Sequence, residues 1–443
     1  MRNYTREEIM ELVEEEDVGF IRLQFTDIFG NMKNMAIPVN QLPKALDNRI
    51  VFDGSSIDGY ARMEESDMYL YPDLNTFEIF PWRPQQGKVA RFICNVYKTD
   101  GTPYSQDPRQ VLAKAIAEAK ELGLSFRVRP ECEFFLFHTD ENGMATTTTH
   151  ERASYFDVGP LDMGENARRD IVLTLEEMDI AVKSSHHEHA PGQHEIDMEF
   201  AEASCMADDL MTFKTVVKTI AKRHGLHASF MPKPLSSVHG SGMHLNMYMR
   251  RDDKNIFTDQ GDAYGLSKEA YYFIAGIMKH IKAITFITNP LVNSYKRLVT
   301  GYEAPSHIAW SPINKTQLIR IPSIRGESTR IELTSPDPAA NPYLALAVCL
   351  KAGLQGIKDR QLPPSAIDQT IAKMSAAEVA RAQVEALPRT LLEAAGAFEE
   401  DEFIRSVVGE ELARKLIKAK KAEYLDYAEK VSTWEIEQYL HRI

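Results

Sequence analysis

Apolar and polar residues alternate with a period of two along much of the first hundred positions, a pattern typical of strands that bury one face. The alternation runs through residues 18–38 and is interrupted at Gly30-Asn31, a pair that favours a hairpin turn. Residues 89–97 repeat the pattern and predict another strand, whereas residues 1–16 predict a short helix. The first hundred residues are therefore expected to form a small β-rich unit.

A cluster of turn-forming residues, GTPYSQDP at 101–108, follows the last of these strands. We place a domain boundary there, with a small domain over residues 1–103 and a larger one over residues 104–443. A chain of 443 residues suits such a division, because single hydrophobic cores rarely grow beyond about 250–300 residues.

Beyond this boundary, helical periods and strand periods are interleaved. The expected helices lie at 108–124, 167–178, 208–225, 269–287 and 341–359, and in most of the tail from about 374. The expected strands lie at 125–137, 240–249, 319–322 and 329–335 and, as a pair, between 180 and 200. These strands and helices do not alternate regularly along the chain, so the sequence favours the α+β class over a parallel α/β class.

The composition is that of an ordinary globular protein, with 44% hydrophobic and 26% charged residues. A net charge of −13 argues against nucleic acid as a direct partner, because phosphate backbones are bound by clustered Lys and Arg. The four cysteines are scattered, so neither a disulfide framework nor a zinc knuckle is expected. The charged N-terminus and the lack of a long apolar run predict no membrane span and a cytoplasmic protein.

Two glutamates stand two positions apart in the predicted strand PECEFF. On a strand Glu131 and Glu133 project from the same face, whereas Cys132 points to the other face and is expected to be a small core residue. Two neighbouring carboxylates repel each other, so a cation is expected between or near them.

Further candidate ligands lie in other strands. Glu188 and Glu195 flank a turn at Pro191-Gly192, and the histidines of this segment are additional candidates. His244 and Glu332 complete the set. Any one of these glutamates alone would be interpreted as a surface residue. As a set embedded among apolar strand residues, they favour a site for hard divalent ions, Mg²⁺ or Mn²⁺.

Several segments resemble the signatures of the glutamine synthetase family, in the family's order and nearly end to end. They are FDGSSIDGY (52–60), PECEFFLF (130–137), SHHEHAPGQHEID (185–197), GSGMH (240–244), NSYKRL (293–298), GYEAP (301–305), IRIP (319–322), TRIEL (329–333) and DPAANPYLAL (337–346). The resemblance implies a small β-grasp domain followed by a large catalytic domain with an antiparallel sheet. It also implies an ATP-dependent ligase that makes glutamine from glutamate and ammonia through γ-glutamyl phosphate.

The resemblance also implies roles for individual residues, with two or three metal ions per site. Glu133, Glu188 and Glu195 resemble the ligands of one metal, and Glu131, His244 and Glu332 those of a second that bridges the ATP phosphates. Arg320 and Arg330 resemble phosphate-facing arginines, with Lys315 and Asn246 also on the nucleotide side.

The implied substrate contacts are Arg297 for the α-carboxylate of glutamate, together with Gly240, His239 and Thr334. Glu303 resembles the flap glutamate that closes the site. Asp53 resembles the acid that binds ammonium and takes its proton, supplied by a neighbouring subunit.

Assembly and regulation also follow from the resemblance. Family members are dodecamers of two hexameric rings. Residues 366–374 lack the tyrosine loop of the adenylylated subtype, and Arg62 resembles an arginine linked to glutamine feedback in the short subtype. The C-terminal VSTWEIEQYL resembles a tail that binds nitrogen-responsive transcription repressors, although Trp434 is equally explained as a packing residue.

Three residues depart from the family pattern near the substrate. His239 replaces an asparagine, Lys315 replaces an arginine, and Thr334 replaces an arginine on a strand face that it is expected to share with Arg330 and Glu332. Three explanations are compatible with these changes: glutamine synthesis with a rearranged pocket, a γ-glutamyl amide ligase with another acid or amine, or a weakly active paralogue with a nitrogen-regulatory role. Asp53 and Glu303 favour ammonia as acceptor.

Overall fold

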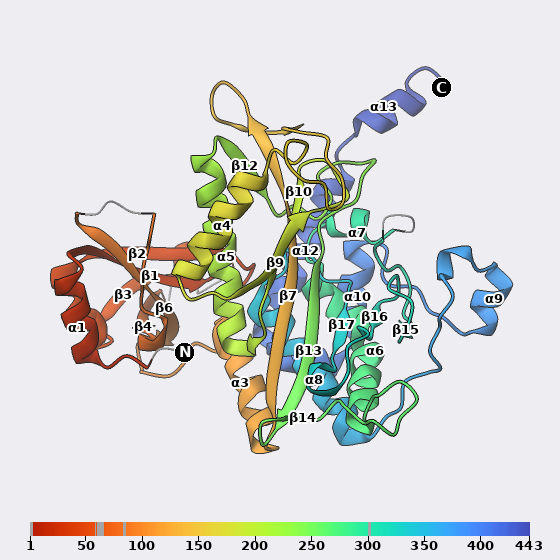
Figure 1. Cartoon of the computed structure of the whole chain (residues 1–443), viewed down its shortest axis with the longest axis horizontal. Coiled ribbons are helices and arrows are strands. Elements are labelled where there is room, and N and C mark those ends of the chain that lie inside the picture. The colour runs from red at the N-terminus through yellow and green to blue at the C-terminus, as the bar shows by residue number, and fades with distance from the viewer. Residues whose placement is uncertain (1–2, 58, 60–65, 83–85, 300–302) are drawn as a thin grey trace.

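The computed structural model describes residues 3–57, 59, 66–82, 86–299 and 303–443, which form two sheets with flanking helices (Figure 1). The first sheet has the order β2-β1-β6-β4-β3, with β5 paired to β6. Its strands are β1 (Val18–Thr26), β2 (Met32–Pro38), β3 (Ile50–Asp53), β4 (Asp67–Pro72), β5 (Glu78–Ile79) and β6 (Lys88–Lys98), accompanied by the helices α1 (Arg6–Glu15) and α2 (Leu42–Leu46). The pairing of β1 with β6 is parallel and the other pairings are antiparallel.

The predicted hairpin turn lies between β1 and β2 and also contacts the second domain. Asp27 accepts hydrogen bonds from the backbone N–H groups of Phe29 and Asn31, and Gly30 has a φ of +85°. A Cβ atom on Gly30 would lie 2.9 Å from the Cα of Asn341, which also donates a hydrogen bond to the Asp27 carbonyl at 3.1 Å. A glycine is therefore required both by the backbone conformation and by the close approach of the second domain.

The second sheet supports the cavity described below. Its strands are β7 (Ser125–Thr139), β8 (Ala145–Thr149), β9 (Val182–His187), β10 (Gln193–Met198), β11 (Ala201–Glu202), β12 (Leu226–Ser229), β13 (Met243–Arg251), β14 (Lys254–Asn255), β15 (Trp310–Ser311), β16 (Ile319–Arg320) and β17 (Ile331–Leu333). The main order is β15-β16-β17-β13-β7-β10-β9, and the shorter strands pair with β7 or β13. The long strand β7 therefore lies between the strands that carry the other candidate ligands.

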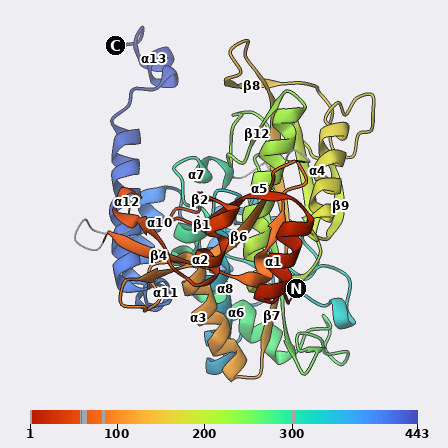
Figure 2. The ribbon, with the colours of Figure 1, turned by 90° about the vertical axis from the view of Figure 1, so that its left-hand side faces the viewer.

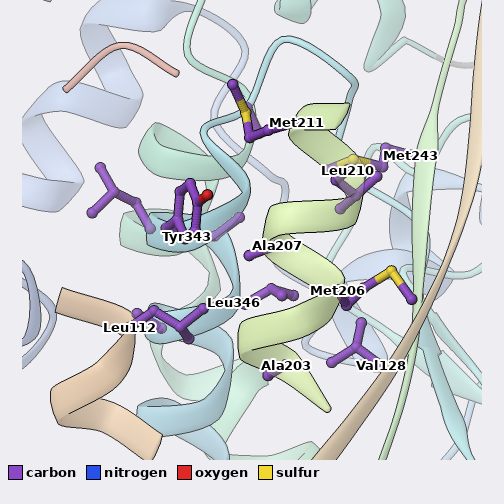
Figure 3. Close-up of a cluster of buried hydrophobic side chains, with 14 of the residues drawn as sticks. Leu112, Val128, Ala203, Met206, Ala207, Leu210, Met211, Met243, Tyr343 and Leu346 are labelled. Atoms are coloured by element: carbon purple, nitrogen blue, oxygen red, sulfur yellow. The ribbon is translucent and has the colours of Figure 1, made fainter. Parts of the chain in front are cut away.

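Helices cover this sheet and extend to the C-terminus. They are α3 (Pro108–Glu121), α4 (Glu165–Glu177), α5 (Ala203–Arg223), α6 (Lys268–Thr288), α7 (Ser294–Arg297), α8 (Pro342–Asp359), α9 (Ala376–Arg381), α10 (Leu391–Glu400), α11 (Glu402–Val408), α12 (Glu410–Ala428) and α13 (Thr433–Tyr439). In Figure 3, Met206 and Leu210 of α5 point toward Val128 of β7 and Met243 of β13, while Tyr343 lies on the neighbouring helix α8. All five side chains are buried, so this layer stabilises the sheet from behind.

The connection between the two sheets runs from the end of β6 to Asp107, whose side chain caps α3 by accepting a hydrogen bond from Arg109. The expected domain boundary after residue 103 falls within this connection. At the other end of the chain, α13 projects away from the body (Figures 1 and 2). Within the described residues, no helix is both long and apolar enough to cross a membrane. The architecture confirms the predicted α+β class.

Candidate active site

Neighbouring strands of the second sheet bring the predicted metal ligands together. In the sheet register, Glu133 lies opposite Glu195 and Glu131 lies opposite His244, while Glu332 lies one strand further along. Glu188 follows the end of β9. Five of these six residues line a cavity of about 150 Å³, and Glu332 is fully buried beside it. The alternation in PECEFF thus predicted correctly that Glu131 and Glu133 share a face.

One half of the cavity, which we call the arginine-paired cluster, consists of Glu131, His244 and Glu332. The Nδ1 atom of His244 lies 3.2 Å from Glu332 Oε1 and 3.8 Å from Glu131 Oε2, and Arg320 Nε lies 2.5 Å from Glu332 Oε2. Burial opposes ionisation of Glu131, yet contacts with His244, Arg129 and Arg320 hold its pKa well below the ordinary value. Burial likewise disfavours protonated His244, but Glu131 and Glu332 raise its pKa to about 10.

Two further polar side chains hold Glu131 from behind. Its Oε1 atom accepts hydrogen bonds from Arg129 at 2.8 Å and from the Nδ2 atom of Asn246 at 3.0 Å. Asn246 is fully buried, and its Oδ1 atom accepts a hydrogen bond from Arg330 Nε at 2.8 Å. Both ends of Asn246 are thus engaged within the protein, where it positions Glu131 and Arg330, and its nucleotide contact stays a prediction. Arg330 is also buried and does not line the cavity, so its phosphate contact stays a prediction.

The other half, the carboxylate cluster, consists of Glu133, Glu188 and Glu195. His186 lies between two of them, with Nδ1 3.3 Å from Glu188 Oε1 and Nε2 3.3 Å from Glu195 Oε1. Burial and then the charge of Glu133 raise the pKa of Glu188 to about 8, and the same two causes raise the pKa of Glu195 well above its ordinary value. In the described part of the chain, no Lys or Arg forms an ion pair with any of the three.

The shifted pKa values show that negative charge in the carboxylate cluster is not compensated by the protein itself. A divalent cation would relieve it, and oxygen atoms are the ligands that Mg²⁺ and Mn²⁺ prefer. Each half contains a group of side chains whose ligand atoms lie within 4.8 Å of one another: Glu131, His244 and Glu332 in one half, and His186, Glu188 and Glu195 in the other. The site therefore fits two cations. His186 joins the predicted ligands, as the histidine-rich segment allowed.

Glu133 is held by neutral donors. Its Oε2 atom accepts hydrogen bonds from the backbone N–H of Gly242 at 2.8 Å and from the Nε2 atom of Gln193 at 3.0 Å. The same Gln193 amide donates to the carbonyl of Gly240 at 3.0 Å. Gly240, predicted as a substrate contact, does line the cavity.

Arg297 reaches the cavity from α7 and is buried. Its guanidinium donates to the backbone carbonyls of Thr334, Ser335 and Pro336 at 2.8 to 3.3 Å. A Cβ atom on Gly242 would lie only 2.4 Å from its NH2 atom, so a glycine is required for the guanidinium to fit.

The expected direction of Thr334 is wrong. Its side chain does not line the cavity; instead, the hydroxyl donates to the carbonyls of Gln317 at 3.0 Å and Leu318 at 3.2 Å. The physical reason is that β17 covers only Ile331–Leu333, so Thr334 lies beyond its end, where the alternation of a strand no longer applies.

The mouth of the cavity contains Glu303, Lys315, His189 and His239. Glu303 Oε2 lies 3.4 Å from His189 Nε2, and Glu303 Oε1 lies 3.8 Å from Lys315 Nζ. Of the three departures from the family pattern, Lys315 and His239 therefore do reach the site.

The predicted ammonium-binding residue Asp53 does not line this cavity. Asp53 is exposed in the first domain, where its carboxylate accepts hydrogen bonds from Ser55 at 2.6 and 2.8 Å. Its implied position at a neighbouring subunit's site stays a prediction. Arg62 lies outside the described residues.

Tyr155, in contrast, was not predicted. It lies in an irregular segment before α4, where no period marks a site residue, and its ring stacks on His189 with centroids 4.5 Å apart. Burial and then the charges of Glu188, Glu195 and Glu303 raise the pKa of its phenol. The tyrosine thus lies near three carboxylates of the cavity.

Two groups of side chains that could each hold a cation lie at one cavity with two arginines. This combination is typical of enzymes that act on anionic substrates. Two family profiles match the chain: "Glutamine synthetase, beta-Grasp domain" over residues 17–99 and "Glutamine synthetase, catalytic domain" over residues 105–439. The chain belongs to the glutamine synthetase family, a family of ligases.

Individual relatives agree with this assignment. The chain is 57% identical to a glutamine synthetase of Clostridium saccharobutylicum over 442 residues, covering 100% of both chains. It is 52% identical to a glutamine synthetase of Staphylococcus aureus (strain N315) over 440 residues, covering 99% of both. Among solved structures, a GmaS/ADP complex matches with a TM-score of 0.88 and 31% identity over 97% of this chain and 98% of that one. The Plasmodium falciparum glutamine synthetase matches with a TM-score of 0.88 and 25% identity over 99% of each chain.

Proposed function

We propose that this protein is a glutamate–ammonia ligase that makes glutamine from glutamate, ammonia and ATP through γ-glutamyl phosphate. The observation that supports this most directly is the placement of two different cation sites in one cavity with Arg297, Arg320 and Glu303. Mg²⁺ or Mn²⁺ held by the two clusters would neutralise the charge that builds up when a phosphoryl group meets a carboxylate.

The protein side chains supply binding and orientation. Arg320 lines the cavity beside Glu332 and offers positive charge to the transferred phosphoryl group. Arg297 also lines the cavity, is anchored by three carbonyls and would bind the α-carboxylate of glutamate. A fixed orientation of both reactants accounts for a large part of such catalysis.

Ammonium is attracted to the negative region around Tyr155. The aromatic ring and the carboxylates of Glu188 and Glu303 together suit a small cation. Ammonium becomes a nucleophile only after it loses a proton, and a carboxylate is the group available to accept it. We assign this step to Asp53 of a neighbouring subunit, with Glu303 closing the site against water.

The assembly and the location of the protein belong to the same proposal. A dodecamer of two hexameric rings in the cytoplasm would bring Asp53 of one subunit to the cavity of the next, and the mass of the assembly in solution tests this. The contact of the C-terminal segment with a nitrogen-responsive repressor stays a prediction; α13 projects from the body and Trp434 is 59% exposed.

A second candidate function is a γ-glutamyl amide ligase that uses another acid or amine. It is favoured by one observation, the presence of both His239 and Lys315 in the cavity lining, where the family pattern has an asparagine and an arginine.

One assay distinguishes the candidates. Release of ADP is measured with glutamate, with and without ammonium, first with Mg²⁺ and then with Mn²⁺. Turnover that depends on ammonium supports glutamine synthesis. Turnover with a polyamine or ethanolamine but not with ammonium would support the second candidate. No turnover with any acceptor would overturn both and leave the weakly active regulatory paralogue.

A further inference from the structure

Two histidines and a glutamate meet at the mouth of the cavity, outside the two cation clusters. Ligand atoms of His189, His239 and Glu303 all lie within 4.8 Å of one another. The imidazole rings of the two histidines are in edge-to-face contact, with centroids 4.6 Å apart. None of the three residues belongs to the arginine-paired cluster or the carboxylate cluster.

We propose that His189, His239 and Glu303 form a separate site for a zinc-like transition-metal ion, whose occupancy ties Glu303 to the body of the enzyme and inhibits turnover.

The spacing of the ligand atoms supports this site. Zinc binds nitrogen and oxygen ligands at about 2.0–2.2 Å in tetrahedral geometry, so two ligand atoms on one ion are roughly 3.3–3.5 Å apart. His189 Nε2 and Glu303 Oε2 are 3.4 Å apart. A direct charge-assisted hydrogen bond would be shorter, about 2.7–2.9 Å. The observed distance therefore fits a pair of metal ligands better than a direct ion pair.

The chemistry of the ligands separates this site from the two clusters. Its two imidazoles and one carboxylate suit zinc, cobalt or copper, whereas the carboxylate cluster offers mainly the oxygen ligands that Mg²⁺ prefers.

The surroundings fix the ligands while leaving the site accessible. Tyr155 stacks on the ring of His189 with an interplanar angle of 11°, and the backbone N–H of His189 donates to Glu188 at 3.1 Å. Side-chain exposures of 33% for His189 and 49% for Glu303 leave an open path for an ion. Lys315 contacts the other oxygen of Glu303 at 3.8 Å, so Oε2 is the atom that would bind the metal.

Metal binding can be tested without any assay of turnover. The full-length protein is saturated with Mg²⁺, and Co²⁺ is then titrated as a spectroscopic probe for zinc, with equilibrium dialysis giving the number of ions bound. We expect one additional Co²⁺ per subunit, with the visible absorption of a histidine-ligated ion, that a further tenfold excess of Mg²⁺ does not displace.

Variants locate the bound ion. We expect His239→Asn and His189→Gln each to weaken Co²⁺ binding by about 10- to 100-fold or more, because each removes one ligand. His227→Asn, on β12 and outside all ligand groups of the described chain, is the matched control and should bind Co²⁺ as the wild type does. Equal Co²⁺ affinity in His239→Asn, His189→Gln and wild type would overturn the site, as would displacement of Co²⁺ in proportion to added Mg²⁺.

The inhibition arm rests on the proposed function. Micromolar Zn²⁺ added in excess Mg²⁺ should inhibit ammonium-dependent ADP release by the wild type. Inhibition is expressed relative to the zinc-free rate of each protein. In His189→Gln, the affinity of Zn²⁺ as an inhibitor should fall by the same factor as the affinity for Co²⁺. Equal inhibition of both proteins would refute the inhibitory role. If the wild type shows no ligase turnover, only the proposed function fails, because the Co²⁺ titration does not depend on turnover.

Discussion

The arginine-paired cluster and the carboxylate cluster lie side by side on one sheet, but their charges are compensated in different ways. Glu131 and Glu332 contact Arg129, Arg320 and His244, so positively charged groups of the protein balance their negative charge. The carboxylate cluster has neutral donors and one histidine, and the pKa values of Glu188 and Glu195 are raised. We therefore expect the first cluster to be stable without a metal and the second to be stabilised by a cation.

The largest expected effect is a loss of turnover, and it should be similar for substitutions in the two clusters because turnover requires both. We expect Glu131→Gln and Glu195→Gln each to reduce ammonium-dependent ADP release by about 100- to 1,000-fold, since each removes a charge that stabilises the reacting groups through a metal. Steady-state assays at saturating Mg²⁺ measure this. Near-normal activity of either variant would show that its cluster takes no part in the reaction.

The pH dependence of stability should separate the clusters. The pKa of Glu188 is raised from 4.5 to about 8, so the stability that its protonated form contributes is present below about pH 4.5 and is lost as pH rises toward 8. We expect the Tm of the metal-free protein to fall over this range. Saturating Mg²⁺ should abolish the decline, because the metal binds the ionised carboxylates.

The contribution of Glu131 to stability should depend on pH in the opposite direction. Its pKa is lowered, so its contribution is present near neutral pH and is lost only in strong acid. A metal-free Tm that stays flat or rises between pH 5 and pH 8 would contradict the account of the carboxylate cluster.

A smaller effect should follow from removing the support behind Glu131. Asn246→Ala leaves Arg330 and Glu131 each without one hydrogen bond in a buried setting, so we expect a loss of about 1–3 kcal/mol in the free energy of unfolding. Urea denaturation measures it. Asn142→Ala, at an exposed turn, is the control and should change the value by less than about 0.5 kcal/mol. Equal effects of the two changes would exclude a positioning role for Asn246.

The smallest effect concerns Lys315 at the mouth of the cavity. Its side chain is 70% exposed, and its Nζ atom lies 3.8 Å from Glu303. Lys315→Arg retains the positive charge and introduces a planar guanidinium that can form two hydrogen bonds. We expect a change of no more than about threefold in the KM for glutamate and none in metal-free stability, since exposed ion pairs contribute only about 0–1 kcal/mol. A large loss of turnover would show that the pocket is adapted to a lysine.

The period of the hydrophobic residues was sufficient to predict much of the fold. It located β7, α3 and the turn at Gly30, and the spacing of Glu131 and Glu133 predicted a shared face. These predictions succeeded because each depends on contacts within one element or one turn.

The remaining features depend on contacts between distant segments. Thr334 was misplaced because β17 ends one residue earlier, and a period gives no information about where a strand stops. The burial of Asn246 between Arg330 and Glu131 depends on the order of the strands in the sheet. Tyr155 comes from an irregular segment that has no period.

The central claim is that the two clusters differ in how their charge is compensated, and one matched pair of substitutions tests it most directly. Thermal unfolding of the metal-free protein is measured above pH 8, where Glu188 is ionised, for the wild type, Glu188→Gln and Glu332→Gln. Both substitutions remove one charge at almost constant shape. We expect a higher Tm for Glu188→Gln, because repulsion between carboxylates is removed, and a lower Tm for Glu332→Gln, because Arg320 and His244 lose their partner. Shifts of the same sign in the two variants would contradict it.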